Sequence, residues 1–325
     1  MKQNLLSVNN LNVEFPTRHG VLHALSDVSF NIQPGEVLGM VGESGAGKSL
    51  TGAAIIGLLE PPGRISSGEI YLNEQRIDQL NQAQMRRIRG RQIGAIFQDP
   101  LTSLNPLYTV GQQIIETIQT HLHLSSQAAR KRAIELLDAT GIPAAASRID
   151  HYPHQFSGGM RQRVVIALAL AAEPKLIVAD EPTTALDVSI QAQIIELLKT
   201  LCQEHGTAIL LITHDMGVIA DIANRVAVMY AGRLIEIGPV ENIIKQPLHP
   251  YSTGLMHSIP SIHHLNKRLK QIPGSMPRLN AIPSGCAFHP RCQKRLIECT
   301  KHRPTLTEIN PQHFTACWLH KEFKA

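Results

Sequence analysis

The chain has 325 residues, of which 43% are apolar and 18% are charged. This composition supports a sizeable core and excludes a disordered or fibrous chain, and at about 150 residues per domain the length predicts two domains. The net charge of +5 is too small for this length to indicate nucleic-acid binding. The longest apolar run, Val164–Ala172, has nine residues, and Met1–Phe15 has no apolar block. Because a bilayer span needs about 20 apolar residues, we expect a cytosolic protein with no span and no secretory signal.

The first part of the chain, to about residue 98, has the pattern of short strands interrupted by one helix. Strands are predicted at Ser7–Phe15, Val28–Ile32, Val37–Val41, Glu69–Leu72 and Ile93–Phe97, and the helix at Lys48–Leu59. From about 99 to 156 the strand pattern is lost. Helical spacing appears there at Val110–His121 and Gln127–Thr140.

From 157 to 246 predicted helices and strands alternate, which indicates βαβ units and a parallel sheet. The helices are Gly158–Ala172, Ser189–His205 and Met216–Ile222, and the strands are Leu176–Ala179, Ala208–Ile212 and Arg225–Tyr230. From about 247 the tail is rich in Pro and His, so we expect little regular structure in it.

A glycine-rich segment between a predicted strand and a predicted helix fits the pattern G-x-x-x-x-G-K-[ST]; it consists of Gly42, Glu43, Ser44, Gly45, Ala46, Gly47, Lys48 and Ser49. Glycines let the backbone N–H groups turn toward phosphate oxygens, and the helix start adds partial positive charge. Lys48 would bind the β- and γ-phosphates of ATP, Ser49 would bind Mg²⁺, and we include Leu50 in the binding segment. A chance match occurs in about one per cent of chains this long, and the strand–loop–helix context lowers that figure.

Two acids, Asp180 and Glu181, follow the apolar strand that ends at Ala179. They would lie at the carboxyl edge of a parallel sheet, where such sheets bind ligands. Asp180 would hold Mg²⁺ and Glu181 would polarise an attacking water. Alone, an Asp-Glu pair here would favour a helix cap, but together with the phosphate loop it favours catalysis.

A second anion-binding helix start, Ser157-Gly158-Gly159, lies between these motifs. One phosphate site needs only one such start, so the second suggests a site for another chain's nucleotide. Here the sequence resembles ATP-binding-cassette (ABC) ATPases, whose signature motif usually reads Leu-Ser-Gly-Gly-Gln. Phe156 and Met160 replace its outer residues. The resemblance implies that Ser157, Gly158 and Gly159 contact the γ-phosphate held by a partner cassette.

Four further landmarks of that family occur in order, so that the resemblance covers about residues 5–245. Phe15 resembles the aromatic residue that stacks on adenine, although a strand core residue is nearly as good an interpretation. Gln98 resembles the glutamine that reaches Mg²⁺ and the attacking water. Asp187, in Ala185-Leu186-Asp187, resembles the loop that contacts the opposite subunit, and His214 resembles the histidine at the γ-phosphate.

The resemblance implies an α/β fold, the P-loop NTPase nucleotide-binding domain of ABC proteins with a mixed sheet. We expect this domain over 1–246, with a helical subdomain at about 99–173, and a small irregular C-terminal domain over 247–325. Segments of that tail, and Asp99–Pro106, resemble the dipeptide and oligopeptide importer ATPases; the tail segments are Gln246–Ser252, Ile272–Gly274 and Gly285–Cys292. Relatives in the same branch move nickel complexes, so nickel or another small solute is the alternative cargo.

The importer resemblance implies a peripheral ATPase at the cytoplasmic face of the cell (inner) membrane. Its partners would be a second ABC ATPase subunit, in a heterodimer, and two membrane permease subunits. A periplasmic or extracellular solute-binding protein would take part indirectly, and no nucleic acid is expected. A soluble ABC ATPase acting on DNA or ribosomes is disfavoured because the chain has one cassette and no heptads. A non-hydrolysing regulatory module is disfavoured because Glu181 and His214 are present.

Four of the five cysteines, Cys286, Cys292, Cys299 and Cys317, lie in the last 40 residues, whereas Cys202 stands alone. A reducing cytosol disfavours disulfides, so the cluster points to a metal or cluster site. Its gaps of five, six and seventeen residues fit neither zinc ribbons nor bacterial ferredoxins. Some relatives with this pattern carry a [4Fe–4S] cluster. We therefore expect a structural [4Fe–4S] cluster, with Zn²⁺ as the alternative.

Overall fold

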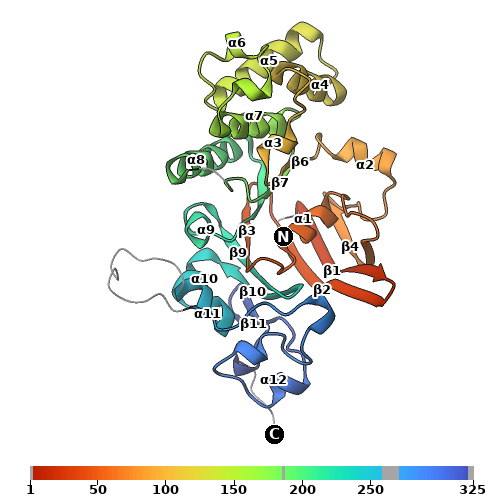
Figure 1. The fold of residues 1–325 in the computed structure, drawn as a ribbon, viewed down its shortest axis with the longest axis vertical. Coiled ribbons are helices and arrows are strands. Elements are labelled where there is room, and N and C mark those ends of the chain that lie inside the picture. Colours follow the sequence, from red (N-terminus) through yellow and green to blue (C-terminus); the bar gives the residue numbers. More distant parts are fainter. Residues whose placement is uncertain (1–2, 185–186, 258–270, 321–325) are drawn as a thin grey trace. The chain divides into compact units, whose positions relative to one another are not determined.

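The computed structural model describes residues 3–184, 187–257 and 271–320 (Figure 1). Contacts between residues divide the chain into two units, each assembled from separate stretches of sequence. The first unit comprises Met1–Leu5, Ile32–Glu36 and Gln79–Leu211, and the second comprises Leu6–Asn31, Val37–Asp78 and Ile212–Ala325.

The first unit contains three adjacent strands in the order β8-β7-β6, at Ala208–Ile212, Leu176–Asp180 and Ile93–Ile96. Strands β6 and β7 run parallel, with Ile93 opposite Leu176. Every residue of β8 is buried, as is every residue of β7 before Asp180. Continuous apolar runs of this kind are expected for parallel strands that are covered on both faces.

The helices of the first unit are α2 (Gln82–Ile88), α3 (Pro100–Ser103), α4 (Val110–Leu122), α5 (Ser126–Ala139), α6 (Ala145–Arg148), α7 (Gly158–Leu170) and α8 (Val188–His205), with a 3₁₀ turn at Pro153–Gln155. Helices α4 and α5 contact each other, and both contact α7 (Figure 1, yellow to green). Their inward residues recur every four positions, as a buried helix face requires: Val110, Ile114 and Ile118 in α4, and Ala129, Ala133 and Leu137 in α5.

The second unit contains two groups of strands. The first has the order β2-β1-β4-β5, at Gly20–Ile32, Leu6–Thr17, Arg64–Leu72 and Gln75–Arg76. The second has the order β11-β12-β10-β9-β3, at Thr307–Asn310, His313–Thr315, Arg233–Pro239, Arg225–Tyr230 and Val37–Val41. Strand β3 runs parallel to β9, whereas β10 is antiparallel to β9 and to β12, so the strands form a mixed sheet.

The helices of the second unit are α1 (Lys48–Ile55), α9 (Met216–Ile222), α10 (Val240–Lys245), α11 (Pro250–His257) and α12 (Glu298–Lys301), with 3₁₀ turns at Leu279–Ala281, His289–Arg291 and Trp318–His320. In the residues that the structure describes, no helix is both long and apolar enough to span a membrane.

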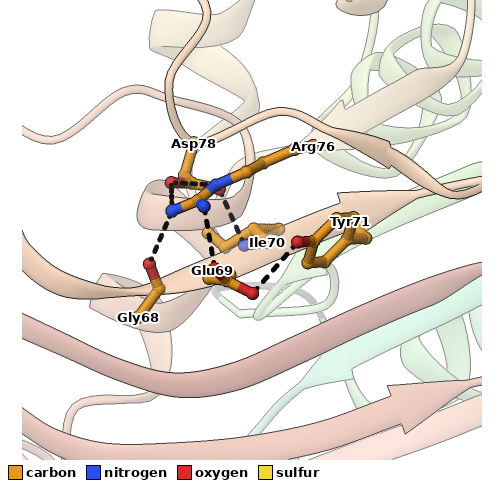
Figure 2. Close-up of polar contacts among 6 residues, drawn as sticks. All are labelled: Gly68, Glu69, Ile70, Tyr71, Arg76 and Asp78. Carbon is orange, nitrogen blue, oxygen red and sulfur yellow. Dashed lines mark hydrogen bonds and ion pairs between the residues drawn. The ribbon is translucent and has the colours of Figure 1, made fainter.

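A charged cluster holds the β4–β5 hairpin at the edge of its sheet (Figure 2). The guanidinium of Arg76 donates to Asp78 at 3.1 Å, to Glu69 at 2.8 Å and to the carbonyl of Gly68 at 3.3 Å. Asp78 also accepts from the backbone N–H of Ile70 at 2.9 Å. One arginine therefore ties the short return strand to the longer strand that precedes it.

The predicted elements are present, with shifted ends: β1 is longer than predicted, Val28–Ile32 is the last part of β2, and α1 ends at Ile55 rather than Leu59. The prediction of little regular structure after residue 247 missed α11 and the strands β11 and β12. Strand β12 pairs with β10, with Glu236 opposite Thr315, so part of the tail completes a sheet. Strands of three residues, such as β12, are too short to show an alternating apolar pattern. They are therefore not predicted from sequence.

The tail is anchored by a carboxylate that is buried beneath it. Glu236 of β10 is fully buried, and it accepts from His313 at 2.7 Å and from the backbone N–H groups of Leu248 and His249 at 2.7 and 2.8 Å. Burial alone would raise the pKa of Glu236, but these hydrogen bonds outweigh it and lower the pKa. Glu236 therefore stays ionised and joins two segments that lie far apart in sequence.

Because His249 is buried beside Glu236, we expect the stability of the tail to depend on pH. It is 1% exposed, its Nδ1 accepts from the N–H of Tyr251 at 3.0 Å, and burial lowers its pKa from 6.5 to about 4. As the pH falls below 6.5, the imidazole of His249 becomes protonated in the unfolded chain before it does in the folded chain. Stability is therefore fully present above pH 6.5 and is lost as the pH falls toward 4, by about 3 kcal/mol.

The free energy of unfolding of the tail can be followed by the fluorescence of Trp318, the single tryptophan of the chain. His249→Gln should lose stability less steeply between pH 6.5 and 4 than the natural chain, because glutamine does not titrate there. His302→Gln, a change of an exposed tail histidine, is the matched control and should keep the natural pH dependence. Identical pH profiles for His249→Gln and the natural chain would contradict this account.

Candidate functional site

The phosphate loop connects β3 to α1 through backbone conformations that only glycine adopts readily. Gly42 and Gly47 have φ angles of 151° and 103°. A Cβ atom at Gly42 would lie 2.4 Å from the carbonyl oxygen of Met229, and one at Gly47 would lie 2.7 Å from Leu25. Gly42 and Gly47 are therefore required both by the turn and by the close approach of β9 and β2, respectively.

Lys48, the first residue of α1, folds back over this loop. Its side chain is buried, and Nζ donates to the carbonyl oxygens of Gly42 at 2.8 Å and Glu43 at 3.1 Å. The N-cap residue is Gly47, which has no side chain to cap the helix. The ammonium group and the helix start thus bring positive charge to one concave turn of backbone, which suits a phosphate group.

The remaining loop residues differ in their exposure to solvent. Ser44, Gly45 and Ser49 are exposed, whereas Ala46 is buried and Leu50 is half-buried. The Ser49 hydroxyl is a hard oxygen ligand of the kind that Mg²⁺ takes.

In the first unit, the structure brings Glu181 and Gln98 together. Glu181 follows β7 and has a φ of 47°, which is strained for a residue other than glycine. Its Oε2 accepts from Nε2 of Gln98 at 3.1 Å and from the hydroxyl of Thr184 at 2.8 Å. Asp180, the preceding residue, ends β7 and is half-buried. Two side chains therefore hold one carboxylate at the end of a buried strand.

The signature segment begins α7. The Ser157 hydroxyl accepts from the N–H of Met160 at 3.4 Å, and Ser157 and Gly158 are both exposed. Gly159 lies against α8, where a Cβ atom would be 2.9 Å from Ile190. Phe156, the first departure from the usual motif, is buried. The exposed helix start is accessible to a ligand carried by another molecule.

The other predicted residues lie at the ends or edges of elements. Phe15 lies on β1 and is half-buried, and its ring would be 2.7 Å from a Cβ atom at Gly63. His214 is exposed and follows β8. Asp187 is exposed at the start of α8, whereas residues 185 and 186 of the same predicted loop lie outside the described residues.

Sequence reasoning missed Thr184, Tyr251 and Arg291. Thr184 holds Glu181, and Tyr251 and Arg291 both contact Glu43 of the phosphate loop. The loop and these two tail residues are more than 200 positions apart, so no local pattern could have identified the contacts.

The structure overturns the prediction of an iron–sulfur cluster and its zinc alternative. Cys286, Cys292, Cys299 and Cys317 line one small cavity, but in the described part of the chain no group of three or more His, Cys, Asp or Glu side chains could hold a metal ion. Burial raises the pKa of Cys286 to about 11 and of Cys317 to about 12. The prediction was wrong because it rested on the number of thiols and on a resemblance.

The phosphate loop should not tolerate a side chain at Gly42. Gly42→Ala should destabilise the second unit by about 1–3 kcal/mol more than Gly20→Ala, because it adds a clash to the backbone strain. Gly20 is the matched control, since its φ is 120° but no atom lies within 4 Å of a Cβ there. Urea unfolding followed by Trp318 fluorescence measures both variants. Equal losses of stability would contradict the proposed close approach of the loop to Met229.

Comparison with known proteins agrees with this geometry. The family model described as "ABC transporter" matches residues 25–184, and that described as "Oligopeptide/dipeptide transporter, C-terminal region" matches residues 235–299. The oligopeptide transport ATP-binding protein OppD of Haemophilus influenzae is 48% identical over 98% of this chain and 98% of its own. The dipeptide transport ATP-binding protein DppD of Bacillus subtilis is 47% identical over 98% of this chain and 95% of its own.

Solved structures show the same fold. The dimeric, post-hydrolysis structure of the ATP-binding cassette MJ0796 bound to ADP and Pi has a TM-score of 0.65 at 31% identity, and it covers 72% of this chain and 98% of its own. The predicted fold class and the resemblance to importer ATPases are thereby confirmed. The chain belongs to the ABC transporter family of ATPases, in the group that carries the C-terminal region of oligopeptide and dipeptide transporters.

Proposed function

We propose that this chain is the ATP-hydrolysing subunit of an importer for dipeptides or oligopeptides. The observation that carries the proposal is the carboxylate of Glu181, held at the end of β7 by Gln98 and Thr184. A chain that only sensed nucleotide would need the phosphate loop but not this carboxylate. The names of the relatives support transport of peptides as the work that hydrolysis drives.

The residues present fit ATP and Mg²⁺. The backbone of the phosphate loop and Lys48 would hold the phosphates, and the oxygens of Ser49 and Asp180 would hold Mg²⁺, with Gln98 close to the attacking water. Bound Mg²⁺ would supply charge that stabilises the transferred phosphoryl group. Glu181 would accept the proton of the attacking water, and His214 would contact the γ-phosphate. Phe15 would stack on adenine.

The exposed start of α7 supports a second cassette as partner. Ser157 and Gly158 are accessible, and a helix N-terminus binds anions, so a partner's nucleotide could be contacted there. The structure of MJ0796, described as dimeric, supports pairing of cassettes. We propose a heterodimer in which Asp187 lies near the opposite subunit.

The remaining assignments follow from the importer proposal. Two permease subunits in the membrane would bind the cassettes at its cytoplasmic face, and a solute-binding protein would deliver cargo from outside. We assign the nucleotide-binding domain to 1–246, its helical subdomain to about 99–173 and the C-terminal domain to 247–325. Uptake of labelled dipeptides, oligopeptides and nickel chelates by the reconstituted complex tests the cargo. Uptake of the nickel chelate alone would contradict the peptide assignment.

Replacing Glu181 tests the catalytic proposal. Glu181→Gln should lower the rate of ATP hydrolysis by about 10²–10⁴-fold, because glutamine cannot accept the proton, and should leave the dissociation constant for ATP unchanged. The measurements are phosphate release and binding of a fluorescent ATP analogue. Glu135→Gln, a change of an exposed acid on α5, is the control and should keep the natural rate. Hydrolysis at the natural rate by Glu181→Gln would show that this carboxylate is not the base.

A further inference from the structure

The C-terminal region contacts the phosphate loop through a partly buried ion pair. Arg291 and Glu43 meet through two parallel hydrogen bonds, Nη1 to Oε2 at 2.9 Å and Nη2 to Oε1 at 3.0 Å. The side chain of Arg291 is 8% exposed and that of Glu43 is 28% exposed. Paired, two-pronged contacts of this kind fix geometry as well as charge, and removal of one partner leaves a buried charge unpaired.

Arg291 is itself held by two other segments of the second unit. Its Nε donates to the carbonyl of Pro273 at 2.8 Å, Nη2 donates to the carbonyl of Gly274 at 3.3 Å, and Nη1 lies 3.4 Å from the hydroxyl of Tyr230. The guanidinium also lies over the rings of Tyr230 and Phe288, at 5.8 and 5.9 Å from their centres. Because Nε, Nη1 and Nη2 each have an acceptor, Arg291 has little freedom to turn away from Glu43.

The turn that carries Arg291 is rigid for a separate reason. Gly285 has a φ of 67°, and a Cβ atom there would lie 2.2 Å from the carbonyl oxygen of Cys299. The N–H of Cys286 donates to that same carbonyl at 2.8 Å, and the carbonyl of Cys286 accepts from the N–H of His289 at 2.9 Å. The turn thus fixes the backbone that carries Arg291.

A second tail residue holds the backbone of Glu43. The hydroxyl of Tyr251 accepts from the N–H of Glu43 at 2.8 Å. Tyr251 is fully buried and packs edge-on against Tyr230 and Phe288, with ring centres 4.8 and 5.4 Å apart. The tail therefore forms hydrogen bonds with both the side chain and the backbone of Glu43.

Glu43 also contacts the groups that are proposed to bind phosphate. Its carbonyl oxygen accepts from Lys48 Nζ at 3.1 Å and from the N–H of Ala46 at 3.1 Å. The residue that the tail fixes is therefore also the residue that holds the ammonium group in place. Preorganised donors bind phosphate more tightly than mobile ones because less freedom is lost on binding.

We propose that Arg291 and Tyr251 are positioning residues of the nucleotide site, through which the C-terminal region sets the affinity of the phosphate loop for ATP. The inference rests on the proposed function, since it takes residues 42–49 as the ATP phosphate site. Neither residue touches the nucleotide; both act through Glu43. The C-terminal region is then a working part of the ATPase as well as the mark of the importer branch.

The test is the dissociation constant of the full-length chain for ATP with Mg²⁺, measured with a fluorescent ATP analogue. Arg291→Gln should raise it about tenfold, and Tyr251→Phe, which removes one hydroxyl and keeps the aromatic cluster, about threefold. Arg291→Lys should recover only part of the loss, because lysine cannot make the two-pronged contact. Glu43→Gln combined with Arg291→Gln should cost no more than the larger single change, because both remove one interaction.

The matched control is Arg130→Gln, which breaks an exposed two-pronged pair with Asp150 in the first unit and should leave ATP affinity unchanged. Trp318 fluorescence reports whether the tail of each variant is folded. If Arg291→Gln unfolds the tail, Tyr251→Phe decides: natural affinity with a folded tail overturns the proposal, and a threefold loss supports it. Lys48→Ala distinguishes failure of the proposed phosphate site from failure of the role proposed for the tail. ATP binding by that variant would refute the phosphate site itself. Loss of binding in Lys48→Ala with natural affinity in Arg291→Gln and Tyr251→Phe would refute only the role of the tail.

Discussion

The structure depends on the backbone between β3 and α1 turning within a space that admits no side chain. The backbone of Gly42 lies so close to the carbonyl of Met229 in β9 that a side chain has no room there. Gly47 is the N-cap residue of α1 and has a left-handed conformation. Once the loop has this shape, Lys48 must fold back over it, and the helix start faces the same concavity. The shape of the backbone and the position of Lys48 therefore support the proposed phosphate site.

The same loop explains why the C-terminal region is where it is. A loop made of three glycines and small residues has little side-chain packing of its own, so its shape needs external support. Glu43 supplies the attachment point, because its carboxylate, N–H and carbonyl each have a partner: Arg291, Tyr251 and Lys48. A buried aromatic group and a rigid turn then hold those partners. The stability of the tail and the readiness of the loop for phosphate thus share the same contacts.

The features that sequence predicted well are those whose chemistry is local. Gly42–Ser49 has a spacing that only a phosphate loop requires, and the apolar runs at β7 and β8 are short, continuous and bounded by breakers. The contact between Gln98 and Glu181 was not predicted, because the family resemblance implies only that Gln98 reaches Mg²⁺ and the attacking water. What failed was non-local: Arg291 and Glu43 are 248 positions apart, and each alone resembles an ordinary surface charge. Thr184 was missed because a hydroxyl near an acid is common in loops.

The tail shows two opposite errors. Its prolines led us to expect little regular structure, yet β12 joins β10, and His313 of β12 contacts the buried Glu236. Its cysteines led us to expect a cluster, yet the described residues offer no group of three or more His, Cys, Asp or Glu side chains that could hold a metal ion. In both cases the residue composition of the tail was a poor guide to its structure. What holds the tail in the structure is a buried carboxylate, an aromatic group and hydrogen bonds across distant segments.

The most direct test of this account is a structure of the Glu181→Gln chain with ATP and Mg²⁺. The account predicts that the triphosphate lies on the backbone N–H groups of residues 43–49 and is also contacted by Lys48 Nζ. It also predicts that Arg291 and Tyr251 keep their contacts with Glu43. A triphosphate bound elsewhere, or one bound at this loop with both tail contacts broken, would contradict it.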